Sequence, residues 1–322
     1  MRLLIIKTSS LGDVIHNLPV ISDIVAQSPG AEIDWVVEEN FAEIPKMHPR
    51  VRRVIPVCLR RWRRRLLNPD SWRDLSRFRR DLKSETYDVI LDTQGLVKSA
   101  WLARQARGPV CGQDRDSARE PLAAFLYHRR FSVPRGRHAI VRNRDLAAQA
   151  LGYALPAHPP DYGMAPPPVN FPFNIPNKFM LALHATSRPS KHWPTEHWAT
   201  LGQELESHGI ELLLPWGSAE EKQQARTIAQ YLKNATVLPS LTLRELAALM
   251  GRAQAVVGVD TGLVHLAAAL GRPTVALYTD SSPALTGVVA GKAGHVCNLG
   301  DVGQIPKPMA VRHALTALGV VA

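Results

Sequence analysis

Cysteine is scarce in this sequence. Its 322 residues include only Cys58, Cys111 and Cys297, which are far apart and have neither metal-ligand nor redox spacing. A small disulfide-stapled fold is therefore excluded, and the pattern gives no support to a zinc site or to CxxC redox chemistry. We expect reduced thiols and a cytoplasmic location.

Long apolar runs are also missing. The N-terminal run is too short for the hydrophobic region of a signal peptide, and no later segment approaches the roughly 18 apolar residues of a membrane span. Hydrophobic residues still make up 45% of the chain, enough for one large core or two of ordinary size. We expect a soluble protein that can touch a membrane surface.

Two common nucleotide-binding signatures are absent, because the sequence contains neither a Walker P-loop nor GxGxxG. Their absence argues against an ATPase or an NAD-dependent enzyme. Residues 114–116, DRD, have the form of a metal-binding Asp-x-Asp pair. They lie among arginines and do not follow an apolar strand, so we expect no metal there.

Positive charge is concentrated in the first half. Residues 1–165 hold 27 Lys and Arg against 18 Asp and Glu, and residues 166–322 hold 12 against 10. Residues 50–80 alone contain 12 arginines and two aspartates. Arginine suits phosphate and carboxylate partners because its planar fork bonds two oxygens. Nucleic acid, an anionic membrane surface and a phosphorylated lipid or sugar all remain open, as does a merely solvated helix face.

Short apolar runs alternate with amphipathic segments of helical length, which predicts an α/β protein with largely parallel sheets. The expected strands span residues 2–7, 32–38, 53–57, 88–93 and 108–112, then 178–185, 210–217, 235–239, 255–260 and 273–278. Eight prolines in residues 155–177 exclude helix and central strand there. We expect two Rossmann-like domains facing across a cleft, residues 1–165 and 166–322, and we allow the final helix to pack back on the first domain.

Open α/β sheets bind ligands beyond the carboxyl ends of their strands, and the first such loop here is KTSSLGDVIHNLP, residues 7–19. Gly12 has no Cβ, so the backbone there can turn sharply and a ligand can come close. Asp13 then lies in the first helical turn, where a carboxylate can act as a base toward a bound hydroxyl. The alternative is a helix cap, although Ser9 and Ser10 are also available for that role.

A second loop follows the strand at 255–260. Asp260, Thr261 and Gly262 precede a helix whose free N–H groups, including that of Leu263, form an anion site suited to a diphosphate without a metal. The alternatives are N-capping for Asp260 and an ordinary place on the helix for His265.

A third loop, residues 183–198, offers the hydroxyls of Thr186 and Ser187 and the charge of Lys191 to the same diphosphate. A solvated lysine is the alternative. In a fourth loop, Glu220 and Glu221 begin a helix, where an acid can accept from sugar hydroxyls or simply complement the helix dipole.

These motifs together resemble one family. The chain is similar to the ADP-heptose:lipopolysaccharide heptosyltransferases in KTSSLGDVIHNLP (7–19), DTQGLVKSA (92–100), AREPLAAFLY (118–127), HAT and KHWP (184–186 and 191–194) and VDTGLVHLAAAL (259–270). The resemblance implies a GT-B fold and inverting, metal-independent transfer without a cofactor. It also implies transfer of L-glycero-D-manno-heptose from ADP-heptose to the Kdo region of Kdo2-lipid A, peripherally at the cytoplasmic face of the inner membrane.

Residue roles follow from the resemblance alone. Asp13 matches the general base, and Lys191 is assigned to both catalysis and donor binding. Further donor positions are Thr186, Ser187, Glu221 at the ribose, Leu241 at the adenine, Asp260, Thr261, Gly262, Leu263 and His265. The acceptor positions are Lys7, Gly12, Arg60, Arg61, Arg63, Arg64 and Arg119. One departure is LYTDSSPAL, residues 277–285, which lacks the expected glycine-proline turn.

Two rivals remain. One is another GT-B enzyme, such as a transferase of a later heptose. The other is a basic nucleic-acid-binding protein that uses the arginine-rich segment, but few aromatic residues accompany that segment and the second half would have no purpose. We therefore expect no nucleic-acid partner.

Overall fold

The computed structural model describes residues 1–64, 69–186, 188–292 and 294–321, without the side chains of residues 60, 63, 64, 69 and 70. The chain divides into two compact units, Met1–Gly163 and Met164–Ala322. The division falls within residues 153–178, which form neither helix nor strand, as the prolines there predicted.

The first unit is built on a parallel six-stranded sheet of order β3-β2-β1-β4-β5-β6. Its strands are β1 (Arg2–Ile6), β2 (Glu32–Glu38), β3 (Val51–Val57), β4 (Val89–Asp92), β5 (Val110–Gln113) and β6 (Arg129–Phe131). Its helices are α1 (Leu11–Ile15), α2 (Leu18–Gln27), η1 (Glu39–Phe41), α3 (Glu43–Lys46), α4 (Leu59–Arg64), α5 (Pro69–Lys83), α6 (Val97–Gln105), η2 (Pro121–Leu126) and α7 (Ala139–Leu151).

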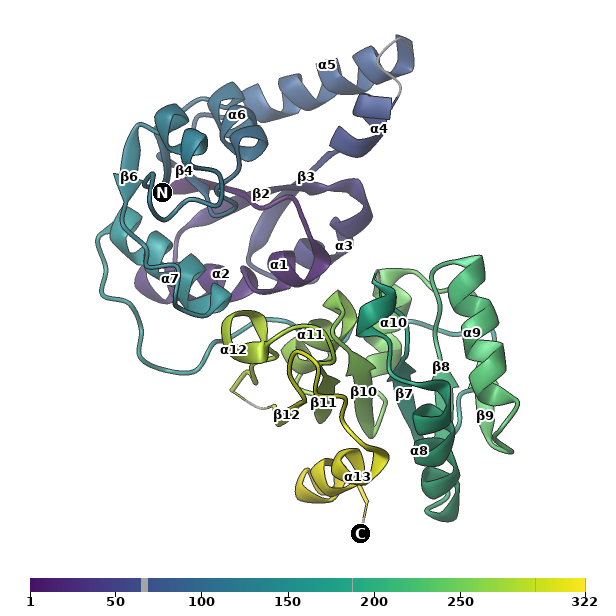
Figure 1. Ribbon diagram of the computed structural model, residues 1–322. Helices are drawn as coiled ribbons and strands as arrows, with labels where there is room; N and C mark the ends of the chain where they lie inside the picture. Colours follow the sequence, from purple (N-terminus) through teal and green to yellow (C-terminus); the bar gives the residue numbers. More distant parts are fainter. Residues whose placement is uncertain (65–68, 187, 293, 322) are drawn as a thin grey trace. The chain divides into compact units, whose positions relative to one another are not determined.

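Helices cover both faces of this sheet. Figure 1 shows α2 and α7 on one side and α5 and α6 on the other. On the second side, Leu4 and Ile6 of β1 pack in one apolar cluster with Phe78 of α5, Leu102 of α6 and Ala124 of η2. Four consecutive buried residues in β1 suit a strand that is covered on both faces.

The second unit repeats the plan with a parallel sheet of order β12-β11-β10-β7-β8-β9. Its strands are β7 (Phe179–Leu183), β8 (Glu211–Leu214), β9 (Ala235–Val237), β10 (Ala255–Val259), β11 (Thr274–Leu277) and β12 (Val296–Leu299). Its helices are η3 (Pro189–Lys191), α8 (Thr195–Ser207), α9 (Ala219–Ala229), α10 (Leu243–Met250), α11 (Gly262–Ala269), α12 (Pro283–Thr286) and α13 (Pro308–Ala317).

The prediction of an α/β protein with two Rossmann-like sheets is confirmed, and every expected strand is present. Two strands were missed, β6 and β12. Each is an edge strand with a single neighbour and no fully buried residue, so neither carries the apolar run that marks a central strand. The final helix, α13, buries Val311 and Leu315 in the core of the second unit and contacts α8.

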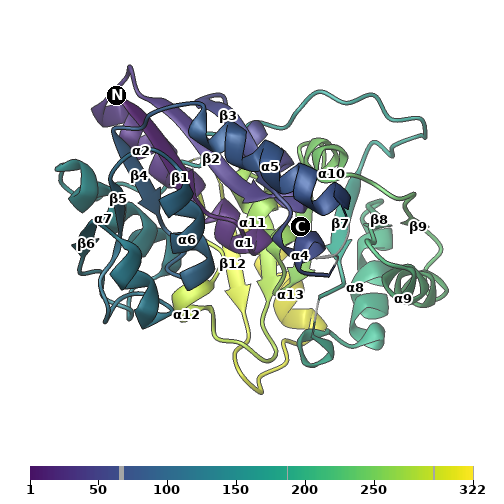
Figure 2. The same cartoon turned by 90° about the horizontal axis from the view of Figure 1, so that it is seen from above.

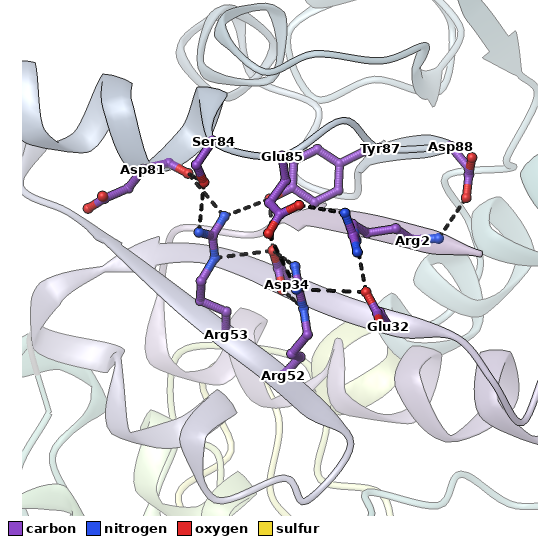
Figure 3. A network of polar contacts seen from close by, with 10 residues as sticks. All are labelled: Arg2, Glu32, Asp34, Arg52, Arg53, Asp81, Ser84, Glu85, Tyr87 and Asp88. Atoms are coloured by element: carbon purple, nitrogen blue, oxygen red, sulfur yellow. Dashed lines mark hydrogen bonds and ion pairs between the residues drawn. The ribbon is translucent and has the colours of Figure 1, made fainter.

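A polar network ties β1, β2 and β3 to the segment after α5 (Figure 3). Its centre is Asp34, whose carboxylate is fully buried. This carboxylate accepts hydrogen bonds from Arg52 Nε at 2.9 Å and Nη2 at 2.8 Å, from Arg53 Nε at 3.2 Å and from the Tyr87 hydroxyl at 2.8 Å. Burial, followed by the bond to Asp34, raises the pKa of Tyr87 to about 12, so the tyrosine remains a donor.

Loss of the Asp34 charge should destabilise the first unit. In Asp34→Asn the two arginines face an uncharged partner, but each is about one-third exposed. Water therefore screens part of the loss, and we expect the free energy of unfolding to fall by about 2 kcal/mol. Urea unfolding measures this change. Glu43→Gln, which removes an exposed pair with Lys46, is the control and should cost less than about 0.5 kcal/mol. Equal effects of the two substitutions would contradict a structural role for the network.

Candidate active site

Strand order reverses between β7 and β10, and ligand pockets of open α/β sheets form at such a reversal. A pocket of about 270 Å³ lies there, in the second unit. Leu241, Leu243, Leu246 and Leu263 supply apolar wall. Polar groups come from loops after three strands: His184 and Thr186 after β7, Glu221 after β8 and Thr261 after β10. The combination of a flat apolar wall and a few polar groups suits a nucleotide.

A polar cluster adjoins this pocket and is centred on Asp260. Its Oδ2 accepts from Lys191 Nζ at 2.5 Å and from Ser281 Oγ at 2.6 Å, and its backbone carbonyl accepts from Thr186 Oγ1 at 3.2 Å. The expectation that Asp260 could serve as a helix cap is not met, because its carboxylate faces these side chains. The alternative of a solvated Lys191 is also wrong, since its side chain is only 17% exposed.

Helix α11 begins at Gly262, and Thr261 is its N-cap residue. The Thr261 side chain makes no capping bond, and the Val264 N–H donates to the Thr261 carbonyl at 3.3 Å. The N–H groups of Gly262 and Leu263 precede the first residue that can bond back within the helix, so they are the donors that a ligand can use. Gly258 brings the helix close to the sheet, because a Cβ at that position would lie 2.5 Å from Val264 Cγ1. His265 is buried within α11 at 6% exposure and does not line the described pocket.

Glu221 combines two roles in its loop. Its backbone N–H donates to the Ser218 hydroxyl at 3.2 Å, so Ser218 caps α9. Its Oε2 accepts the Gly217 N–H at 2.6 Å while the side chain lines the pocket. The second oxygen, Oε1, is the atom that a sugar hydroxyl can use.

The segment after β11 closes onto the Lys191 loop. Thr279 Oγ1 donates to the Ser190 carbonyl at 2.9 Å, and Ser190 Oγ donates to Asp280 at 2.6 Å. These two hydrogen bonds join residues 277–285, which lack the expected glycine-proline turn, to the loop that carries Lys191.

Two pocket residues, His184 and Trp216, were not among the predicted site residues. His184 is fully buried, and neither ring nitrogen makes a hydrogen bond with the residues that the structure describes. Trp216 donates from Nε1 to the Leu238 carbonyl at 2.6 Å, which fixes its ring at the pocket wall. His184 is the first residue after β7 and Trp216 the second after β8, and that position was the available signal.

In the first unit, Asp13 lies in α1, after the carboxyl end of β1. Its Oδ2 accepts both the N–H and the hydroxyl of Ser10, each at 2.9 Å. The capping alternative is therefore correct for one oxygen, and no described hydrogen bond uses Oδ1. Gly12 lies inside α1 and does not have a positive φ, so the sharp turn that a glycine permits is not made at Gly12.

The turn before Asp13 is held by Gln94, from the loop after the neighbouring strand β4. Its Oε1 accepts from the Thr8 N–H at 2.7 Å, and its Nε2 donates to the Ser9 carbonyl at 2.6 Å. The amide thus joins the two loops that meet at the reversal between β1 and β4.

Cationic side chains approach this turn. Lys7 is 6% exposed and donates to the Thr93 carbonyl at 2.9 Å. Burial lowers the pKa of Lys7, while the nearby carboxylates of Asp13 and Asp92 favour its charged form. Arg119 is exposed and lies close enough to Lys7 to oppose its charge. These two acceptor candidates are therefore neighbours.

The arginine-rich segment is only partly described. Arg61 donates to Glu39 at 3.0 Å and to Asp74 at 2.9 Å, so part of its charge is neutralised within the fold. The side chains of Arg60, Arg63 and Arg64, and the whole of Ser187, lie outside the described residues. Within the described part of the chain, no group of three or more His, Cys, Asp or Glu side chains could hold a metal ion, and no helix is long and apolar enough to cross a membrane.

Comparison with known proteins identifies the family. The model of glycosyltransferase family 9 (heptosyltransferase) matches residues 75–309. This chain belongs to glycosyltransferase family 9. It is therefore a glycosyltransferase, and the predicted family is confirmed.

Named heptosyltransferases match this chain over most of their length. Lipopolysaccharide heptosyltransferase 1 of Pseudomonas aeruginosa is 47% identical over 92% of this chain and 83% of its own. The Escherichia coli K12 enzyme of the same name is 44% identical over 92% and 93%. The solved structure of E. coli heptosyltransferase WaaC with ADP has a TM-score of 0.90, with 41% identity over 98% of this chain and 99% of that one. The predicted GT-B fold is confirmed.

His184 should make this glycosyltransferase sensitive to acid. Burial lowers the pKa of His184 below its ordinary 6.5, although Gln224 and Glu221 favour the charged form. The unfolded chain therefore binds a proton at a higher pH than the folded one, and the free energy of unfolding falls as the pH drops below about 6.5. In His184→Phe this contribution is absent, so urea unfolding between about pH 7 and pH 5 should show a smaller decline. An equal decline in both proteins would contradict the assignment.

Proposed function

We propose that this enzyme transfers L-glycero-D-manno-heptose from ADP-heptose to the Kdo region of Kdo2-lipid A, with inversion and without a metal or cofactor. The observation that carries the proposal is the pocket between β7 and β10, where an apolar wall adjoins Lys191 and the N-terminus of α11. The E. coli WaaC structure with ADP-2-deoxy-2-fluoro heptose has a TM-score of 0.87, which supports the choice of donor.

The donor fits the chemistry of the pocket. Leu241 and the neighbouring leucines suit an adenine ring, and Glu221 Oε1 can accept from a ribose hydroxyl. Lys191, Thr186 and the N–H groups of Thr261, Gly262 and Leu263 suit the diphosphate, whose charge grows as it leaves. Ser187 and Asp260, through their places in the same loops, and His265, in α11, complete the proposed donor set.

Asp13 is the proposed base. The acceptor hydroxyl attacks the anomeric carbon, its proton passes to the Asp13 carboxylate, and the bond to the diphosphate breaks. Oδ2 is held by Ser10, which leaves Oδ1 to take the proton. Because the nucleotide leaves through an oxocarbenium-like transition state, no second carboxylate nucleophile is required.

The acceptor side is proposed to be cationic. Lys7 and Arg119 lie near the Asp13 turn, and Gly12 is adjacent to Asp13 in α1. With Arg60, Arg61, Arg63 and Arg64 they suit the carboxylates and phosphates of Kdo2-lipid A. A lipid acceptor also accounts for peripheral association with the cytoplasmic face of the inner membrane.

Transfer of the first heptose is favoured over transfer of a later one. Identity is 44% to heptosyltransferase 1 of E. coli K12 and 25% to heptosyltransferase 2 of the same organism. A nucleic-acid partner has little support, because Arg61 is already paired with two carboxylates.

Asp13→Asn should reduce kcat by about 10²–10⁴-fold, because an amide cannot accept the proton. The Kd for ADP should not change, since Asp13 lies in the other unit from the pocket. Product formation from ADP-heptose and Kdo2-lipid A measures the first effect, and calorimetry measures the second.

Ser10→Ala is the control for capping. It removes the hydroxyl bonded to Asp13 while leaving the carboxylate in place, so most turnover should remain. Near-normal transfer by Asp13→Asn would refute the base. Equal losses in both variants would show that Asp13 serves only to hold the turn.

Lys191→Ala should raise the Kd for ADP by about 10–100-fold, through loss of a charge-assisted contact with the diphosphate. Adenosine, which has no phosphate, should bind both proteins equally. Lys178→Ala removes an exposed lysine next to β7 and should change neither affinity. An unchanged Kd for ADP in Lys191→Ala, measured by calorimetry, would exclude Lys191 from the diphosphate site.

A further inference from the structure

The outer surface of α5, α6 and η2 carries large apolar side chains. Trp72 is 58% exposed, Val97 37%, Trp101 40%, Leu122 67% and Phe125 68%. These are five of the eleven large hydrophobic residues that are exposed in the described part of the chain. All five lie on the helical layer that covers one face of the first sheet, so the exposed apolar residues are clustered and not scattered over the surface.

Helix η2 buries its small residues and exposes two large apolar ones, whereas a helix that packs on a core usually buries the large ones. In its sequence PLAAFL, Ala123 and Ala124 are buried against the sheet, whereas Leu122 and Phe125 face solvent. In α6, Ala100 and Ala103 are likewise buried while Val97 and Trp101 are exposed. Small residues inside and large apolar residues outside indicate that the outer surface has a partner of its own.

The same layer is cationic. Exposed basic residues on α5 and α6 are Arg73, Arg77, Arg79, Arg80, Lys83, Lys98 and Arg104. Among the described acidic side chains of these helices, Asp74 is paired with Arg61, which leaves Asp81 as the exposed one. Figure 2 shows α5 and α6 side by side in front of the strands of this unit.

We infer that the outer surface of α5, α6 and η2 binds an anionic phospholipid bilayer. Leu122, Phe125 and Trp101 enter the interface, and the arginines and lysines contact lipid phosphates. A second copy of the chain is a poorer partner, because a symmetric contact would place this cationic surface against itself. Nucleic acid would leave the exposed aliphatic side chains without a suitable contact.

This surface is continuous with the proposed acceptor site. Helix α6 starts at Val97, soon after Gln94, which holds the turn before Asp13. Glu120, next to η2, donates its N–H to the Gly95 carbonyl at 2.9 Å and accepts from the Val97 N–H at 2.7 Å. A bilayer on this surface therefore lies beside the loop of the base. That bilayer binding brings the enzyme to its acceptor rests on the proposed function, since only a lipid acceptor requires such binding.

Binding to the bilayer can be tested without acceptor. Sedimentation with vesicles of phosphatidylglycerol and phosphatidylethanolamine should capture the wild-type protein, and capture should weaken with added salt and with phosphatidylcholine vesicles. A triple variant, Trp101→Gln with Leu122→Ser and Phe125→Ser, should bind at least about tenfold more weakly. The double variant Val302→Ser with Ile305→Ser, which removes exposed apolar residues of the other unit, should bind like the wild type.

Transfer assays separate this inference from the proposed function. With a fully deacylated, water-soluble Kdo-bearing acceptor the triple variant should match the wild type, and with acceptor in vesicles its KM should rise. Equal vesicle binding by all three proteins, or none by the wild type, would overturn the inference even if transfer occurs. Concentration-dependent dimerisation that only the triple variant loses would overturn it in favour of a second copy. Failure with both acceptors would instead refute the proposed function.

Discussion

The reversal of strand order within each parallel sheet is the constraint on which the candidate residues of each unit depend. Loops from β1 and β4 leave their sheet in opposite directions, as do those from β7 and β10, so each pair leaves an opening that backbone alone does not fill. Side chains complete it: Gln94 joins the two loops in the first unit, and Asp260 with Lys191 joins them in the second. Equivalent positions in the two sheets therefore carry different side chains, a neutral amide in the first unit and an ion pair in the second.

The buried charges at these two openings have different kinds of partner. Asp92, fully buried behind the first, accepts from Ser99 and Tyr127, and burial raises the pKa of its carboxyl despite these bonds. The second opening pairs a partly buried lysine with a partly buried aspartate. At the first opening, neutral donors around the Asp92 carboxylate fix the loops. At the second, the contact with Asp260 orients the Lys191 ammonium but does not use all of its N–H donors.

Much of this arrangement could be predicted from the sequence. Central strands carry apolar runs and prolines mark the division of the chain, so both were found. Edge strands β6 and β12 pack on one side only, and their short, partly polar sequences gave no such signal. Gly12 shows a different limit: glycine permits a sharp turn without requiring one, and here the helix continues through it. His184 was missed because a buried polar residue after a strand is indistinguishable from core until its surroundings are known. Trp216 was missed because a half-buried tryptophan gives the same sequence signal in a pocket wall as in the edge of a core.

The pairing of Lys191 with Asp260 also bears on selectivity. A phosphate that approaches the ammonium must compete with a carboxylate already 2.5 Å away and with the serine that shares it. With the diphosphate bound as proposed, chloride or inorganic phosphate would gain little from this competition, because neither brings other contacts to the leucine side chains of the pocket. On that proposal the aspartate disfavours simple anions at the lysine and favours ligands that also bind elsewhere in the pocket.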